Sequence, residues 1–356
     1  MTVLSSRTRR STIAKEGLLT TLPTLWFSLI AVLFVGYFFL EGFDYGVGML
    51  VPWVGRTDQE RRAVIATIGP VWDANEVWLI TAAGALFAAF PNWYATLFSG
   101  FYLPLAVLLA ALILRGVALE FRSKDERPSW RTRWDLAIVI GSAVPPIIWG
   151  LAMGNLLHGV PIDQSMDYVG HAATLLNPYA IVGALATVSL FLLHGALYLD
   201  LKAPPELSER AHRIAYRIGP WTTLFYFLFV FLSYFYAHFA HKLGLDPGPI
   251  PVLAGTSMIA VRFLLPGRHR AWAFFALGLT IILSTISVFL ALYPRVMIST
   301  LNPRWSLTIW NASSNPYSLR VMTIVAVTVL PIVLAYQAWT YWIFRQRVSF
   351  QDTWHY

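Results

Sequence analysis

The chain has 356 residues, of which 57% are hydrophobic and 12% are charged, compared with roughly 25% charged residues in an average soluble domain. A soluble domain of this size cannot bury so much apolar surface, so the composition excludes one and indicates a polytopic membrane protein. The chain has no cysteine, which excludes disulfides, thiolate metal sites and thiol nucleophiles. The net charge of +8 comes from basic residues scattered between apolar runs, which form no continuous patch for nucleic acid.

Apolar runs long enough for a membrane span recur along the whole chain, since a helix needs about 20 apolar residues to cross a bilayer. They predict an all-α membrane protein with about nine transmembrane helices, at 24–51, 75–97, 100–120, 136–157, 176–199, 219–240, 249–266, 271–293 and 320–344. We expect one membrane domain over 22–345, preceded by a disordered N-terminal tail (1–21) and followed by a C-terminal tail (346–356).

Basic residues are distributed unevenly over the predicted loops. The loops after the first, third, fifth and seventh spans, together with the C-terminal tail, carry 18 of the 26 Lys and Arg residues. Positively charged loops stay in the cytoplasm, so we expect the C-terminus inside and the N-terminus outside. The basic residues of the N-terminal tail (Arg7, Arg9, Arg10 and Lys15) favour the opposite orientation, but four loops outweigh one tail.

Two pairs of acidic residues lie inside the first predicted membrane hairpin. Glu41 and Asp44 fall near the cytoplasmic end of the first span, and Asp73 and Glu76 fall in the first turns of the second. Each pair is spaced i, i+3, which places both acids on one helix face, and the hairpin brings the pairs to comparable depth. Carboxylates are costly inside apolar helices and, when close together, do not both ionise easily. The pattern indicates a site that takes up protons from the cytoplasm.

Other roles for these acids stay open at this point. Asp73 can be a favourable partner for a helix dipole, and Asp44, followed by Tyr-Gly-Val-Gly, can mark a loosened helix end. The neighbouring glycines permit close helix contact whether or not protons move. A stand-alone proton-coupled secondary transporter and a purely structural assembly subunit are the functional alternatives. Transporters usually have internal repeats and broken helices near mid-membrane, whereas these acids lie near one face.

Two motifs of the hairpin carry a family resemblance, E-G-F-D-Y-G-V-G-M-L (41–50) and I-G-P-V-W-D-A-N-E-V-W-L-I-T-A-A-G-A-L-F-A-A-F-P (68–91). Further motifs are F-S-G-F-Y (98–102), G-S-A-V-P-P (141–146), G-N-L-L-H-G-V-P (154–161) and S-T-L-N-P-R-W-S-L-T-I-W-N-A-S-S (299–314). Together they resemble subunit II of the cytochrome bd quinol oxidases, which are bacterial terminal oxidases. The resemblance covers nearly the whole chain, is weakest across 200–290, and is most specific in the pairing of the two hairpin motifs.

The resemblance implies two four-helix bundles plus a peripheral helix, paired as a heterodimer with a haem-bearing subunit I in the bacterial plasma membrane. It implies an electrogenic oxidase that oxidises ubiquinol or menaquinol and reduces oxygen to water. Two haem b groups and one haem d are expected in the partner, and no cofactor in this chain alone. Quinol, membrane lipid and possible small accessory subunits are the other expected partners. A haem in this chain would need an axial ligand inside a span, and only His194 lies well within one, where a packing role is more typical.

The resemblance also suggests site residues. By position, Asp44, Trp72 and Asp73 match a proposed proton pathway of the family, and Trp78 matches a residue at a proposed oxygen entrance. No residue of this chain is predicted to be catalytic or to bind a metal. We therefore predict a proton pathway and an oxygen entrance, the first formed by Glu41, Asp44, Trp72, Asp73 and Glu76 and the second at Trp78.

Overall fold

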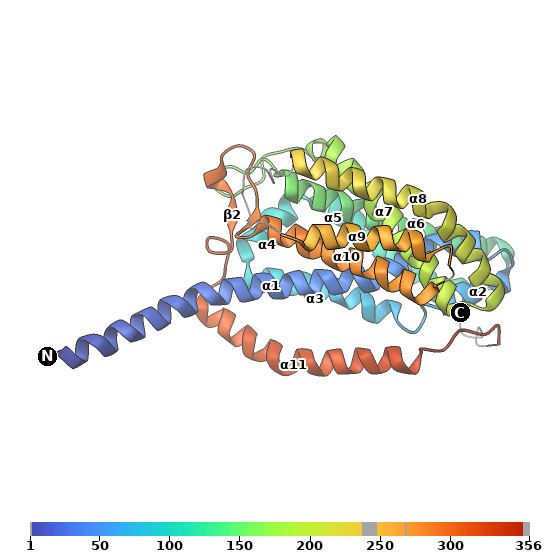
Figure 1. Cartoon of the computed structure of the whole chain (residues 1–356), viewed down its shortest axis with the longest axis horizontal. Coiled ribbons are helices and arrows are strands. Elements are labelled where there is room, and N and C mark those ends of the chain that lie inside the picture. The colour runs from blue at the N-terminus through green and yellow to red at the C-terminus, as the bar shows by residue number, and fades with distance from the viewer. Residues whose placement is uncertain (1, 237–247, 268, 352–356) are drawn as a thin grey trace.

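The computed structural model describes residues 2–236, 248–267 and 269–351, with residues 2–20 described by their helical backbone alone. Within these ranges the chain is mainly helical (Figure 1). The elements are α1 (Thr2–Val54), α2 (Asp58–Ala66), α3 (Trp72–Ala89), α4 (Pro91–Gly100), α5 (Tyr102–Phe121), η1 (Arg122–Lys124), α6 (Pro128–His158), η2 (Ala172–Leu175), α7 (Pro178–Lys202), α8 (Pro205–Tyr236), α9 (Ile250–Leu264), α10 (Arg270–Leu292), β1 (Arg295–Met297), η4 (Pro303–Trp305), β2 (Leu307–Thr308) and α11 (Pro316–Ile343).

Among the described residues, seven helices are long and apolar enough to cross a membrane. These are α1 from Thr21 onward, α5 together with η1, α6, α7, α8, α10 and α11. They confirm the predicted all-α, multi-span class. The remaining two predicted spans, 75–97 and 249–266, correspond to helices that are shorter than the roughly 20 residues a perpendicular span needs.

The predicted span at 75–97 is divided between two helices. α3 ends at Ala89 after 18 residues and α4 begins at Pro91, because Phe90 between them has the non-helical angles φ −134° and ψ 68°. Proline has no backbone N–H, so it suits the first position of a new helix better than the interior of an old one. The span predicted at 249–266 contains α9, which has 15 residues.

The structure describes the two predicted tails to different extents. α1 begins at Thr2, within the segment 1–21 that we expected to be disordered. No proline interrupts that segment, and extending an existing helix costs far less than starting one. Of the predicted C-terminal tail, residues 352–356 lie outside the described residues, as do residues 237–240 of the predicted sixth span.

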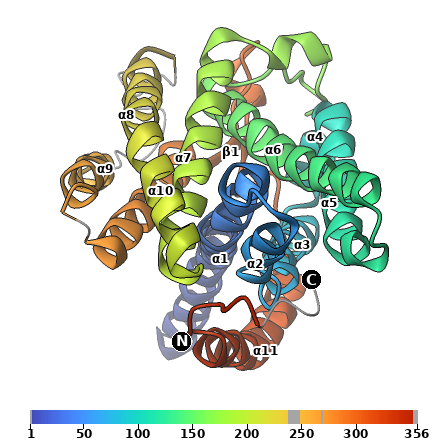
Figure 2. The same ribbon diagram turned by 90° about the vertical axis from the view of Figure 1, so that its right-hand side faces the viewer.

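Helix α1 occupies the centre of the bundle and α11 its periphery. α1 packs against α3, α6, α7 and α10, while α5, α8 and α9 form outer contacts with α6, α7 and α10 respectively (Figure 2). α11 runs alongside α1 and α3 as a separate outer layer (Figure 1). The central position of α1 places the first acidic pair in the interior of the molecule.

Glycines allow α1 and α7 to cross in direct backbone contact. A Cβ atom added to Gly46 would lie 2.0 Å from the carbonyl oxygen of Phe191, and one added to Gly195 would lie 2.2 Å from the carbonyl carbon of Gly46. No larger residue fits at either position without separating the helices. Small residues allow this close approach between membrane helices, and it fixes the height of Asp44 in the bundle.

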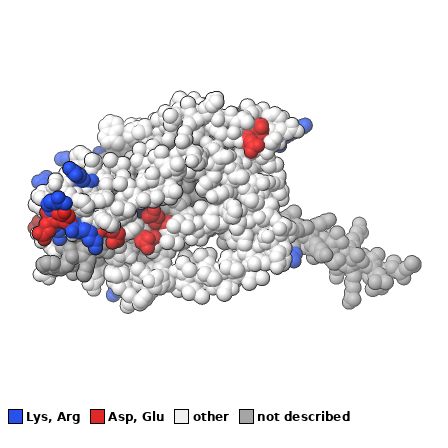
Figure 3. Space-filling model, turned by 180° about the vertical axis from the view of Figure 1, so that it is seen from behind, with Lys and Arg blue, Asp and Glu red and all other residues white. Residues whose placement is uncertain are grey.

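Charged side chains gather at the end of the molecule that carries α2, which we call the charged end (Figure 3). Arg122 is buried there and pairs with Asp135 at 2.5 Å and with Asp58 at 2.9 Å. Arg131 also pairs with Asp58, and Arg61 with Asp135, both at 2.8 Å. These ion pairs join α2 to η1 and α6, so they tie together the loops at this end.

Candidate functional site

The first acidic pair lies in the interior of the bundle. Glu41 and Asp44 are fully buried on α1, one helical turn apart. The glycine beside them makes room for a neighbouring helix, because a Cβ atom on Gly42 would lie 2.9 Å from the ring of Phe191 on α7. The structure therefore agrees with the prediction that these two acids share one buried region.

Arg115 of α5 supplies the positive charge of this region. Its guanidinium forms an ion pair and a hydrogen bond with Oε1 of Glu41, and both side chains have no exposed surface. The same guanidinium lies over the ring of Tyr45, 4.7 Å from the ring centroid, in a cation–π contact. An interior carboxylate is thereby paired, as the cost of burying a charge requires.

The second acidic pair does not meet the first directly. Asn75, which lies between Asp73 and Glu76 in sequence, donates a hydrogen bond of 2.7 Å from Nδ2 to Oδ2 of Asp44. Asp73 is exposed and Glu76 half-buried on another face of α3. The hairpin thus brings α3 to the depth of Asp44, but the amide makes the contact, while Asp73 faces outward and Glu76 is directed elsewhere.

Several polar atoms of the site have no hydrogen-bond partner in the described part of the chain. They are Oε2 of Glu41, Oδ1 of Asp44, and Nε and Nη2 of Arg115, all buried. Most buried polar groups in proteins are hydrogen-bonded to protein or to ordered water, so such a concentration of free donors and acceptors is unusual. Acceptors and donors that are not committed to one partner can bind and release a proton or a water molecule.

The two predicted tryptophans pack against glycines of neighbouring helices. A Cβ atom on Gly116 would lie 3.5 Å from the ring of Trp72, so this tryptophan rests on α5. A Cβ atom added to Gly36 would lie 2.2 Å from the ring of Trp78, so this ring packs directly against the backbone of α1. The indole N–H of Trp78 donates to Oε1 of Gln337 on α11 at 2.9 Å.

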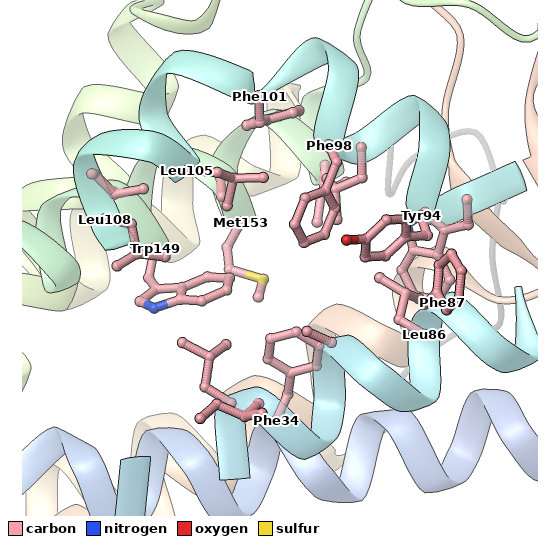
Figure 4. A pocket seen from close by; sticks show the side chains of 18 of the residues that line it. Phe34, Leu86, Phe87, Tyr94, Phe98, Phe101, Leu105, Leu108, Trp149 and Met153 are labelled. Carbon is pink, nitrogen blue, oxygen red and sulfur yellow. The ribbon is translucent and has the colours of Figure 1, made fainter. Parts of the chain in front are cut away.

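An apolar cavity of about 540 Å³ lies beside the site, between α3, α4, α5 and α6. Figure 4 shows aromatic and aliphatic side chains around it, among them Phe34, Tyr94, Trp149 and Met153. Glu76 is the single charged residue in its lining. Of the second acidic pair, Glu76 therefore borders the apolar cavity, whereas Asp73 lies at the surface.

His194 has surroundings that do not suit a haem ligand. Its fully buried ring is enclosed by Phe274, Phe39 and Phe43, at centroid distances of 4.8, 5.5 and 5.7 Å. These rings occupy the space that a macrocycle would need. Neither ring nitrogen has a partner among the described residues, and these residues contain no cluster of three or more His, Cys, Asp or Glu side chains suited to a metal.

Sequence reasoning missed Arg115, Asn75, Gln337 and Tyr341. Arg115 was counted with the loop after the third span, whereas it lies inside α5. A signal was present, because Arg115 is the single charged residue in the apolar stretch 101–119. Tyr341, which donates to Oδ1 of Asn75 at 2.8 Å, carries no comparable signal.

Known proteins resemble this chain over nearly its whole length. Residues 22–344 match the family model for cytochrome bd terminal oxidase subunit II. The chain is 42% identical over 334 residues to cytochrome bd ubiquinol oxidase subunit 2 of Bacillus subtilis (strain 168), covering 94% of this chain and 99% of that protein. It is 38% identical over 362 residues to cytochrome bd-I ubiquinol oxidase subunit 2 of Escherichia coli (strain K12), covering 92% and 95%.

A solved structure has the same fold. The chain is similar to one in the bd oxidase from Geobacillus thermodenitrificans, with a TM-score of 0.76 and 20% sequence identity, covering 91% of this chain and 98% of that chain. At this identity the likeness concerns the arrangement of helices alone.

Proposed function

Since the chain belongs to the cytochrome bd terminal oxidase subunit II family, and so is part of an oxidoreductase complex in a bacterial inner membrane, we propose that it holds a proton-transfer site for that oxidase. The site is formed by Glu41, Asp44 and Arg115. The complex oxidises quinol and reduces oxygen to water, a reaction that consumes protons as electrons arrive. The family assignment implies a partner, subunit I.

The haems of the complex, two haem b and one haem d, are assigned in this proposal to subunit I. They supply the electron transfer and the oxygen chemistry when bound there. This chain contributes no axial ligand in the proposal, because His194, the histidine that the sequence places well inside a span, is enclosed by aromatic rings. Its contribution is the handling of protons and the support of its partner.

The observation that carries the proposal is that buried acidic groups outnumber buried basic groups at this site. One guanidinium, that of Arg115, faces two carboxyl groups, those of Glu41 and Asp44, and all three side chains are fully buried. Arg115 balances Glu41, with which it is paired. A second buried negative charge on Asp44 has no cation of its own, so a proton is the simplest counter-charge available to it. Asp44 is therefore the group that gains and loses the proton.

Asp73, Glu76 and Trp72 extend the route from Asp44 towards the surface in this proposal. Asn75 joins α3 to Asp44; Asp73 precedes it on the exposed face of α3, and Glu76 follows it at the border of the apolar cavity. Trp72 fixes the start of α3 against Gly116 of α5. A proton that reaches Asp73 or Glu76 would then pass α3 to reach Oδ1 of Asp44.

Subunit I is proposed to cover the face of α3 and α5 that carries Asp73. α3 presents the large apolar side chains of Val77 (45% exposed) and Ile80 (67% exposed) on the same helix face as the exposed carboxylate of Asp73. A carboxylate facing lipid at this depth is costly, whereas a protein partner can supply a donor. Trp78, on the same helix, is the proposed oxygen entrance, and the apolar cavity beyond α3 suits an apolar gas.

The proposal includes the membrane arrangement predicted from the sequence. Nine crossings result if α3 with α4, and α9, cross the bilayer in addition to the seven long helices. The charged end then faces the cytoplasm, since it carries most of the basic loops. Protons would enter from that side, which is the end nearer to Asp44.

Replacing Asp44 by Asn tests the proposal, with Asp167→Asn as a matched control at an exposed acid. Both variants are purified through a tag on this chain, and quinol-driven oxygen consumption is divided by the haem content read from the absorbance spectrum. We expect Asp44→Asn to lower turnover per haem at least about tenfold, since removing a positioned proton carrier commonly costs 10²–10⁴-fold. Asp167→Asn should retain full turnover.

Two results would contradict the proposal. If activity and haem content of Asp44→Asn fall together, Asp44 supports assembly and transfers no proton. If the purified wild-type chain is colourless and runs without a haem-bearing partner, the stand-alone transporter alternative takes precedence.

A further inference from the structure

Helix α11 packs loosely against the rest of the chain. Leu319 is its only buried residue within the described part of the chain, and residues along its length, such as Val327 (70% exposed) and Ile332 (67% exposed), face away from the bundle. Few apolar side chains of α11, namely Leu319, Met322, Ala326 and Tyr341, pack against the core, and the helix lies as an outer layer beside the bundle (Figure 1). Its specific contacts are polar, and the central ones lead to the proton-transfer site.

Two residues of α11 reach Asn75. Gln337 and Tyr341 are spaced i, i+4, which places them on one face of the helix. The hydroxyl of Tyr341 donates to Oδ1 of Asn75 at 2.8 Å, and Nε2 of Gln337 donates to the same oxygen at 3.4 Å. Oε1 of Gln337 in turn accepts from the indole N–H of Trp78 at 2.9 Å. Two donors from α11 thus converge on a single acceptor atom of α3.

The direction of these hydrogen bonds is fixed by chemistry. An indole nitrogen can only donate, so Gln337 must present its oxygen to Trp78 and its NH₂ group to Asn75. Asn75 then receives donors at its oxygen, which leaves its NH₂ group to face Oδ2 of Asp44. The amide cannot turn over without losing hydrogen bonds at both of its ends. Asn75 is therefore held as a permanent donor to one oxygen of Asp44.

The end of α11 is anchored so that this register is maintained. Nζ of Lys202, at the end of α7, donates to the carbonyl oxygens of Phe344 and Gln346, the second at 2.7 Å. The backbone N–H of Val348 donates to the carbonyl oxygen of Lys202 at 2.9 Å. This anchor begins three residues after Tyr341, so it limits sliding of α11 along its axis.

We propose that Gln337 and Tyr341 of α11 are positioning residues, which act through Asn75 to hold Asp44 with Oδ2 as a fixed acceptor and Oδ1 as the proton-exchanging atom. The inference rests on the proposed function of Asp44 as a proton carrier. The outer helix thereby determines the geometry of an interior site through hydrogen bonds to Asn75. The hydrogen bond that Oδ2 accepts alters the vibration of the Asp44 carboxyl group, so loss of the fixed donor changes its infrared band.

Three single variants test the inference in the intact complex: Gln337→Met, Tyr341→Phe and the control Tyr336→Phe, whose ring is 63% exposed on α11. Infrared difference spectra locate the Asp44 band, identified by its loss in Asp44→Asn. We expect this band to shift in Gln337→Met and Tyr341→Phe but not in Tyr336→Phe. Turnover per haem should fall about three- to tenfold, as expected for loss of a hydrogen bond between neutral groups.

A double-variant comparison separates positioning from general support of the fold. In an Asn75→Ala background, Tyr341→Phe should produce no further change in the Asp44 band, because Asn75 is the link through which it acts. An unshifted Asp44 band in both Gln337→Met and Tyr341→Phe overturns the inference, whatever happens to haem content. If Asp44→Asn keeps full turnover, the proposed function fails, yet the band still reports whether α11 positions Asp44.

Discussion

The ion pair between Glu41 and Arg115 predicts a large loss of stability when one partner is removed. Both side chains have no exposed surface, and Arg115→Met retains much of the aliphatic length while deleting the charge. Glu41 is then left as a buried carboxylate without its cation. Removing one partner of a buried ion pair costs about 3–5 kcal/mol of stability. Replacing both partners by apolar residues of similar volume, in contrast, is often neutral.

The double variant Glu41→Gln/Arg115→Met should recover most of this loss, because it removes both buried charges together. The control is Arg127→Met, which deletes the partner of Asp125 in an ion pair where the arginine side chain is 71% exposed. An exposed pair contributes less than about 1 kcal/mol, so Arg127→Met should be nearly neutral.

The measurement is the thermal unfolding midpoint of the detergent-purified complex, followed by tryptophan fluorescence. A cost of 3–5 kcal/mol corresponds to a decrease of roughly 6–15 °C for Arg115→Met at about 2–3 °C per kcal/mol. The reasoning is refuted if the double variant unfolds at the same temperature as the single one, since the loss would then arise from packing and not from an unpaired charge.

Two further predictions concern the bundle and its charged end. Gly195→Ala should sharply reduce the yield of assembled complex, because its Cβ atom would overlap the backbone of Gly46. The control is Gly84→Ala, since a Cβ atom at Gly84 would have no other atom within 4 Å. Equal yields of the two variants would contradict the prediction. The hydrogen-bonded guanidinium of Arg210 lowers the pKa of Glu60 from 4.5 to about 2, so Glu60 stabilises the folded state above pH 4.5 and loses that effect as the pH falls towards 2. Glu60→Gln should reduce the loss of folding stability that is measured as the pH falls from 4.5 towards 2. An unchanged loss would contradict the role of the Glu60–Arg210 pair.

The helices that the sequence predicted best are those whose length is dictated by the bilayer. Long apolar runs such as α6, α7 and α10 were predicted because lipid leaves the backbone no alternative to internal hydrogen bonds. The division at Phe90 was missed although Pro91 was visible, since a hydropathy window averages across a break. α9 was assigned as a full span because flanking apolar residues lengthened the run.

The site could be predicted only where its chemistry is local. Glu41 and Asp44 stood out because acids in an apolar helix demand an explanation. Arg115 falls inside the predicted span 100–120 but was counted with the basic residues of the following loop, so it was given no role in the membrane. The contact between Tyr341 and Asn75 spans 266 residues, and no periodicity or spacing encodes such a pairing. Which acids face inward was also unpredictable, since it depends on how α3 is rotated about its axis.

The link between α11 and Asn75 also sets an order of events during biosynthesis. Chains are made from the N-terminus, so α1, α3 and α5 can insert and pack long before α11 exists. Asp44 and Arg115 can therefore meet early, whereas Asn75 receives its two fixing donors only when Gln337 and Tyr341 have been made. A chain interrupted before its last helix contains every acid of the site but lacks the part that orients them. Completion of the site thus coincides with completion of the polypeptide.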